Sequence, residues 1–244
     1  MEEIMMQGTD VVKIYDNGQL KVKAVKGMTF TIKKGELVVI LGQSGAGKST
    51  LLNLIGGMDY VTEGSLIIGG KDVAKYSTKE LIDFRRNNIG FVFQFYNLMP
   101  NLTAKENVEL ACELKKDALD SVQVLESVGL GDKVNNFPAQ LSGGEQQRVS
   151  IARAIAKNAD IILCDEPTGA LDYETGKEIL ALLAKQAREY GKTVIIVTHN
   201  SALAEMCDHL IRVKNGLIAL DEYNENPKDI KDIEWWEIRF TLRQ

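Results

Sequence analysis

The residues of this chain best suited to chemistry lie at positions 42–49, which read Gly-Gln-Ser-Gly-Ala-Gly-Lys-Ser. They match the pattern G-x-x-x-x-G-K-[ST], a loop whose glycines let backbone N–H groups approach phosphate oxygens closely. In such a loop Lys48 reaches the β- and γ-phosphates, and Ser49 offers its hydroxyl to Mg²⁺. The pattern predicts a nucleotide-phosphate site but does not distinguish ATP from GTP. The residues expected to bind the nucleotide here are Gly42, Gln43, Ser44, Gly45, Ala46, Gly47, Lys48, Ser49 and Thr50.

A second candidate is the apolar run Ile161–Cys164, which ends in the acids Asp165 and Glu166. The carboxyl ends of parallel strands gather at one edge of a sheet, where the phosphate loop is also expected. Asp165 is then placed to hold Mg²⁺, directly or through water, and Glu166 to orient and deprotonate an attacking water. Acids often end strands merely as solvated side chains, but the phosphate loop favours the catalytic interpretation.

A third candidate is Ser142-Gly143-Gly144-Glu145, a capping box for a helix expected to run to about Lys157. Its two glycines would leave the N–H groups of the first turn accessible to an anion. The same residues also fit an ordinary capped helix with a flexible entry, so the segment alone leaves both interpretations open.

The elements that must position these residues follow from hydrophobic spacing. Residues 9–35 alternate apolar and polar positions with turns at Asp16–Gly18 and Lys33–Gly35, which predicts antiparallel strands. Thr103 and Glu106 form another capping box, and residues 96–157 are expected to be a helical insertion without a strand. Further strands are expected at Leu37–Leu41, Ser65–Ile68, Ile89–Phe93, Ile161–Cys164 and Thr193–Thr198, and further helices at Lys48–Ile55, Asp120–Val128 and about Tyr173–Tyr190.

Composition narrows the class of protein. There are 29 Lys and Arg against 34 Asp and Glu, a formal net charge of −5, which argues against a broad basic face for nucleic acid. No apolar run approaches the roughly 18–20 residues that span a bilayer, and no secretion signal is recognisable. The three cysteines lack metal-site spacing, and two histidines exclude a His-rich metal site. These features predict a cytosolic α/β protein.

The motifs together resemble ABC-type ATPases. The phosphate loop at 42–49, LSGGEQQR at 141–148 and ILCDEPTGALD at 162–172 occur in the order and spacing of that family, with Gln94 and His199 in matching places. The resemblance covers about residues 9–220. It implies an α/β P-loop NTPase core of RecA-like type, with an antiparallel β edge and an inserted helical subdomain at about 96–157. Residues 1–220 would form one ATPase domain, and 221–244 an acidic C-terminal tail.

The resemblance also implies how the site works. Two copies would pair head to tail as a homodimer, holding ATP and Mg²⁺ between the phosphate loop of one and Ser142, Gly143 and Gly144 of the other. Tyr15 would stack on adenine, although a strand aromatic packed on the core fits the sequence too. The remaining implied roles are Gln94 at Mg²⁺ and the lytic water, His199 at the γ-phosphate and Asp172 at the subunit contact.

One branch of the family matches in finer detail. Phe84-Arg85-Arg86, residues 95–103 and Gly169-Ala170 resemble the macrolide-exporter, lipoprotein-release and antimicrobial-peptide-resistance ATPases. This implies an ATP-hydrolysing subunit that powers a membrane transporter from the inner face of the membrane. Contacts with transmembrane permease subunits are expected at Phe95, Tyr96, Leu98, Met99 and Leu102, unless these residues pack beneath the helical insertion.

Two other functions compete with transport. A soluble ABC-type ATPase in cofactor assembly remains compatible with the sequence. A small-molecule kinase or GTPase is disfavoured, because neither has a use for LSGGEQQR.

Overall fold

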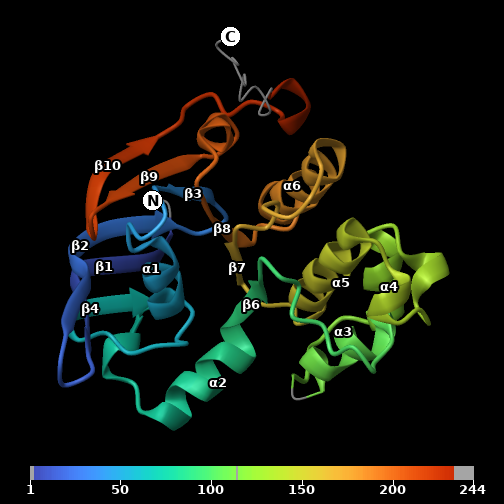
Figure 1. Cartoon of the computed structure of the whole chain (residues 1–244), viewed down its shortest axis with the longest axis horizontal. Coiled ribbons are helices and arrows are strands. Elements are labelled where there is room, and N and C mark those ends of the chain that lie inside the picture. The colour runs from blue at the N-terminus through green and yellow to red at the C-terminus, as the bar shows by residue number, and fades with distance from the viewer. Residues whose placement is uncertain (1–2, 114, 234–244) are drawn as a thin grey trace.

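The computed structural model describes residues 3–113 and 115–233, so Trp235 and Trp236 of the expected tail lie outside the described residues. The strands are β1 (Ile4–Asp16), β2 (Lys21–Lys33), β3 (Leu37–Leu41), β4 (Glu63–Ile68), β5 (Lys71–Asp72), β6 (Ile89–Val92), β7 (Ile161–Asp165), β8 (Thr193–Thr198), β9 (His209–Lys214) and β10 (Leu217–Tyr223). The α-helices are α1 (Lys48–Ile55), α2 (Thr78–Asn88), α3 (Ala104–Cys112), α4 (Ser121–Ser127), α5 (Gly143–Ala156) and α6 (Tyr173–Arg188). Figure 1 shows two sheets beside a separate group of helices.

The larger sheet has the strand order β10-β9-β3-β8-β7-β6 and is parallel except for β10. Its central strands β3 and β8 are buried along their whole length, as is typical of parallel strands covered on both faces. Along β3, Val38 and Ile40 belong to the same core cluster as α1. Leu37 and Val39 belong to the cluster of α6 on the opposite face. The apolar run Leu37–Leu41 therefore fixes the phosphate loop to the middle of the molecule.

The smaller sheet, β2-β1-β4-β5, is antiparallel, as the alternation of residues 9–35 predicts. It packs on the α1 side, where Val11, Val25 and Met28 share a core with that helix. Backbone bonds join β2 to the phosphate loop through the β9–β10 turn: Lys26 N donates to the Gly216 carbonyl, and Gly216 N donates to that of Ala46. The β edge thus supports the phosphate loop.

Helices α3, α4 and α5 form a subdomain between β6 and β7, with a core of its own that includes Val108, Leu125 and Val149. They lie together on one side of the molecule (Figure 1). Over the described part of residues 96–157 no strand occurs, as expected. The capping boxes at Thr103 and Ser142 both form and start α3 and α5.

The described part of the expected tail, residues 221–233, packs against the rest of the chain. Strand β10 continues to Tyr223, and Asp221 on it bonds His209 of β9 at 2.5 Å. Beyond the strand, Ile230 and Ile233 are buried in the core cluster that contains α6. The segment after Leu220 therefore packs on the larger sheet and on α6. Within the residues described, none of the helices has the length and apolar character needed to cross a membrane.

Candidate active site

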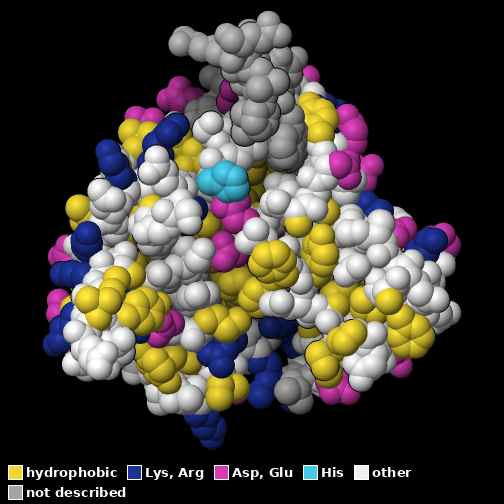
Figure 2. Space-filling view, viewed as in Figure 1, with side chains coloured by type: hydrophobic (Ala, Val, Ile, Leu, Met, Phe, Trp, Pro, Cys, Tyr) yellow, Lys and Arg dark blue, Asp and Glu magenta, His cyan; other side chains and the backbone are white. Residues whose placement is uncertain are grey.

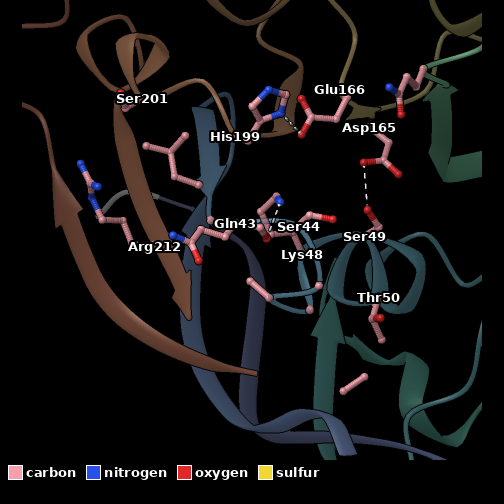
Figure 3. Close-up of a pocket in the computed structure, with 17 residues that line it drawn as sticks. Gln43, Ser44, Lys48, Ser49, Thr50, Asp165, Glu166, His199, Ser201 and Arg212 are labelled. Carbon is pink, nitrogen blue, oxygen red and sulfur yellow. Dashed lines mark hydrogen bonds and ion pairs between the residues drawn. The ribbon is translucent and has the colours of Figure 1, made fainter. Parts of the chain in front are cut away.

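A pocket of about 890 Å³ opens at the carboxyl edge of the parallel strands. Its lining unites residues that the sequence places far apart: the whole phosphate loop 42–50, Gln94, Asp165, Glu166 and His199. Figure 3 shows Lys48, Ser49, Asp165, Glu166 and His199 converging on it from α1, β7 and β8. The structure thus brings these predicted site residues together.

The phosphate loop offers donors to an anion. Helix α1 begins at Lys48, and Gly47 before it has φ 104° and supplies no side-chain cap, so the first N–H groups of the helix are not used by a cap. A Cβ at Gly47 would lie 2.5 Å from the Ala24 carbonyl oxygen of β2, so only glycine fits. The Lys48 Nζ donates to the Gln43 carbonyl at 3.2 Å, which holds the ammonium over the loop.

Oxygen ligands for a cation meet between α1 and β7. The Ser49 hydroxyl donates to Asp165 Oδ1 at 3.1 Å, and Gln94 lines the same pocket. Burial raises the pKa of Asp165, and the charge of Glu166 adds to this, whereas the Ser49 hydrogen bond and Lys48 act in the opposite direction. A hydroxyl, a carboxylate and an amide oxygen fit Mg²⁺, which keeps several waters and takes its other ligands from phosphates.

Glu166 is held in place at three points. Its N–H donates to the Val197 carbonyl at 2.9 Å, and its two carboxylate oxygens contact the Thr198 hydroxyl at 3.0 Å and His199 Nδ1 at 2.9 Å. Its φ of 46° is left-handed, a strained conformation for a residue with a side chain. Such strain persists only where the surroundings enforce it, and here it aims the carboxylate into the pocket (Figure 3).

Ser142, Gly143, Gly144 and Asp172 do not line this pocket. Asp172 instead caps α6, accepting a hydrogen bond from Thr175 N at 3.1 Å. A Cβ on Gly144 would lie 2.3 Å from Thr175 Cγ2, so this glycine is required for α5 to pack against α6. Gly143 is half-buried, and a Cβ on it would lie 3.0 Å from the Tyr96 hydroxyl. Within one chain, then, the 141–148 segment is not brought to the phosphate loop.

Tyr15 also lies outside the pocket lining. It is 43% exposed, so its ring is not a core residue. Its hydroxyl donates to Asp59 Oδ2 at 2.9 Å, and Lys13 Nζ lies 5.0 Å from the ring centroid. Burial, then the contact with Asp59, raises the pKa of Tyr15. The ring is therefore fixed at the surface.

The five residues expected to meet a membrane partner divide into two groups. Phe95 is 74% exposed and Met99 47% exposed. Hydrophobic side chains reach the surface at several places on the face shown in Figure 2. Tyr96, Leu98 and Leu102 are half-buried. Leu98 packs against the core of the helical subdomain, so the packing alternative holds for this residue.

Comparison with known proteins decides the family. The family model described as ABC transporter matches residues 25–169, more than half of the chain. The chain belongs to the ABC transporter ATP-binding family. The resemblance expected from the phosphate loop, LSGGEQQR and the DEPTGALD segment is thereby confirmed.

Similar proteins support the finer placement of this ABC ATPase. It is 47% identical to an uncharacterized ABC transporter ATP-binding protein of Thermotoga maritima over 88% of the chain and 93% of the relative. It is 45% identical to the macrolide export ATP-binding/permease protein MacB of Brucella melitensis over 87% of the chain, but spans only 33% of MacB. The dimeric ATP-binding cassette MJ0796 bound to ADP and Pi has a TM-score of 0.83 and 43% identity, covering 90% of this chain and 98% of that one. Together these relatives support ATP hydrolysis by a dimer in a transporter.

Four residues that line the ABC ATPase pocket were not predicted as site residues by the sequence analysis: Ala24, Leu41, Ser201 and Arg212. Arg212 reaches the site because β9 lies beside β3 and pairs it with Leu41, immediately before the phosphate loop. Sequence spacing carries no information on which strand neighbours β3. Thr198, which holds Glu166, was foreseeable only as the last residue of a buried strand.

Proposed function

We propose that this ABC ATPase hydrolyses ATP at two composite sites of a head-to-tail homodimer and uses the cycle to drive a permease at the inner face of a membrane. The observation that carries the proposal is the division of the site. The phosphate loop, Gln94, Asp165, Glu166 and His199 share one pocket, whereas Ser142–Gly144 start a capped helix outside it. A second copy is required to bring the two parts together.

The pocket residues have distinct roles in this proposal. Backbone N–H groups of 42–48 and Lys48 bind the phosphates, while Ser49, Gln94 and Asp165 hold Mg²⁺, which neutralises phosphate charge when bound. Glu166 accepts a proton from water as the water oxygen attacks the γ-phosphorus. The bond from that phosphorus to the ADP oxygen breaks, releasing ADP and phosphate.

His199 and Tyr15 complete the site. His199 already contacts Glu166 and has an exposed side chain, so its other ring nitrogen is free to meet the γ-phosphate. Tyr15 would stack on adenine, since its ring is exposed and anchored by Asp59. Asp172 would act at the subunit contact through the N-terminus of α6 that it caps.

From the second copy, Ser142, Gly143 and Gly144 would contribute the start of α5. Its helix dipole and first-turn N–H groups favour a bound anion, and the capping box leaves the N–H of Gly143 unclaimed. Donors would then surround the γ-phosphate from both sides, as stabilisation of its transition-state charge requires.

The permease partner is supported by MacB, whose name joins an ATP-binding and a permease part. We place its contact at Phe95 and Met99, the exposed members of the apolar group, with Tyr96, Leu98 and Leu102 beneath them. A role in cofactor assembly without a membrane partner is less favoured, because the similar proteins that carry a functional name belong to transporters.

The test is Mg²⁺-ATP hydrolysis as a function of protein concentration. If two chains build each site, the specific rate rises with concentration and levels off once dimers prevail. Glu166→Gln is the matched control, since it keeps the shape of the side chain but cannot accept a proton. A specific rate that stays constant at dilutions where light scattering detects only monomers would contradict the composite site.

A further inference from the structure

The loop that follows Gln94 has an unusual backbone. Tyr96 and Asn97 are consecutive non-glycine residues in the left-handed region, with φ of 59° and 49°. A side chain disfavours this region of backbone conformation, so each such residue needs support from its surroundings. The loop therefore holds its shape only through contacts with its surroundings.

Those contacts come from one partly buried arginine. Arg153 on α5 donates from Nη2 to the Tyr96 carbonyl at 2.8 Å and from Nη1 to the Asn97 carbonyl at 2.7 Å. Its planar fork meets both strained residues at once, a geometry that lysine cannot reproduce. Burial lowers the pKa of Arg153, in keeping with an enclosed guanidinium.

A second buried side chain holds the other end of the loop. Asn107 on α3 accepts from Met99 N at 2.7 Å and donates to the carbonyls of Met99 and Leu102 at 3.1 and 3.0 Å. It is only 1% exposed, so these bonds are shielded from water. Both anchors of the loop thus belong to the helical subdomain, and neither belongs to the parallel sheet that carries the phosphate loop.

The loop also touches the start of α5. The Tyr96 hydroxyl lies 3.0 Å from the position that a Cβ on Gly143 would occupy. Gly143 is the first residue of the helix whose N-terminus we assign to the ATP of the second copy. The exposed side chains of Phe95 and Met99 therefore sit within a few residues of a direct contact with that helix start.

We propose that Arg153 and Asn107 are positioning residues that lock the loop 95–102 to α5 and α3, so that a displacement at the partner contact moves the Ser142–Gly144 helix start with it. This inference rests on the proposed function, because it takes the loop as the partner contact and the helix start as half of the ATP site. The lock explains how a permease contact far from the phosphate loop reaches the second half of the site.

The experiment uses the full chain with Glu166→Gln, so that ATP is bound but not consumed. The ATP concentration at half-maximal dimer formation is measured by light scattering, and ATP binding to the monomer by a fluorescent nucleotide at high dilution. Arg153→Lys keeps the charge and loses the fork. It should raise the ATP concentration for dimer formation roughly tenfold, the effect of losing about 1.4 kcal/mol of charged hydrogen bonding. Monomer binding should stay unchanged.

A second substitution that restores dimer formation distinguishes loss of the lock from a general loss of stability. Asn97→Gly removes the cost of the left-handed backbone, so adding it to Arg153→Lys should recover most of the lost dimerisation. The matched control is Arg86→Lys on the exposed face of α2, where Arg86 pairs with Asp83 at 3.1 Å. Tyr96→Phe keeps the lock and loses the hydroxyl beside Gly143. It should raise the ATP concentration at half-maximal dimer formation by only about two- to fivefold.

The outcomes distinguish this inference from the proposed function. If Glu166→Gln alone forms no dimer with ATP, the proposed function fails. Hydrogen exchange on the monomer still tests the lock, which requires faster exchange at residues 96–102 in Arg153→Lys and unchanged exchange in β3 and β8. If the dimer forms and Arg153→Lys shifts neither its midpoint nor this exchange, or if Asn97→Gly rescues nothing, the lock is overturned.

Discussion

The two halves of the proposed ATP site are built in different ways. The sheet-borne half, comprising residues 42–50, Gln94, Asp165, Glu166 and His199, stands on buried parallel strands, and its groups bond one another across α1, β7 and β8. The helix-borne half, Ser142–Gly144, is the capped start of a single helix in a subdomain with its own core. The groups of the first half are fixed by bonds to one another, whereas the second half belongs to a subdomain with a separate core.

Of the substitutions that test this comparison, one at Glu166 should have the largest effect on ATP turnover. Glu166→Gln should retain ATP binding, because the phosphate loop is untouched, and should lower turnover by about 10²–10⁴-fold, the usual contribution of a general base. Single-turnover hydrolysis and nucleotide binding measure the two properties separately. Turnover near the wild-type rate would show that the proton of the attacking water goes elsewhere.

A smaller effect, on the stability of the fold, is expected where Gly144 of α5 packs against Thr175 of α6. Gly144→Ala would place a Cβ 2.3 Å from Thr175 Cγ2. Such overpacking costs typically ~1–3 kcal/mol of unfolding free energy, measured by urea denaturation. Thr175→Ser removes the clashing methyl group, so the double variant should regain most of the loss. Equal stability of Gly144→Ala and wild type would mean that α5 and α6 adjust freely.

The smallest effect is expected at His209 on β9, a residue of the larger sheet outside the ATP site. His209 is fully buried, with Nε2 2.5 Å from Asp221 Oδ1 and Nδ1 3.6 Å from Glu36 Oε2. Burial alone lowers the pKa of His209, but the two carboxylates outweigh it and hold that pKa above its ordinary value. The protonated form is therefore favoured by folding, and its stabilisation is complete below the unfolded pKa of about 6.5 and is lost as the pH rises through the folded pKa.

His209→Gln should consequently cost more unfolding free energy at about pH 6 than at about pH 9. Urea denaturation of both proteins at the two pH values gives the difference. A cost that does not change with pH would mean that His209 acts only through packing and hydrogen bonding.

The sequence predicted the sheet-borne half well, because each of its groups ends an apolar run that can only be a buried strand. Residues 42–49 and Asp165 are examples. The capping boxes at Thr103 and Ser142, which start helices, were also predictable because the two partners of each box lie three residues apart. Contacts between segments that are distant in the sequence could not be predicted. The approach of Arg212 to the phosphate loop and of Thr175 to Gly144 depend on strand order and helix packing, which spacing does not encode.

Contacts between distant segments also explain why the packing of residues 221–233 and the backbone of the loop 95–102 could not be predicted from the sequence. Ile230 and Ile233 are isolated apolar residues in an acidic segment, and no periodic pattern marks them as core. The carbonyls of the left-handed residues Tyr96 and Asn97 accept hydrogen bonds from Arg153, which lies more than fifty residues away, so local propensity could not reveal this contact.

The central claim, that each ATP site takes one half from each of two chains, is tested most directly by mixing two inactive variants. Lys48→Ala weakens the sheet-borne half. Gly143→Asp places a negative charge where the helix-borne half meets the phosphate, and the first turn of a helix tolerates an acid, so the chain should still fold. Each variant alone should be nearly inactive, and an equimolar mixture should recover ATP hydrolysis, because the mixed dimer joins the intact phosphate loop of one chain to the intact Ser142–Gly144 of the other. A mixture as inactive as its components, although light scattering shows mixed dimers, would contradict the claim.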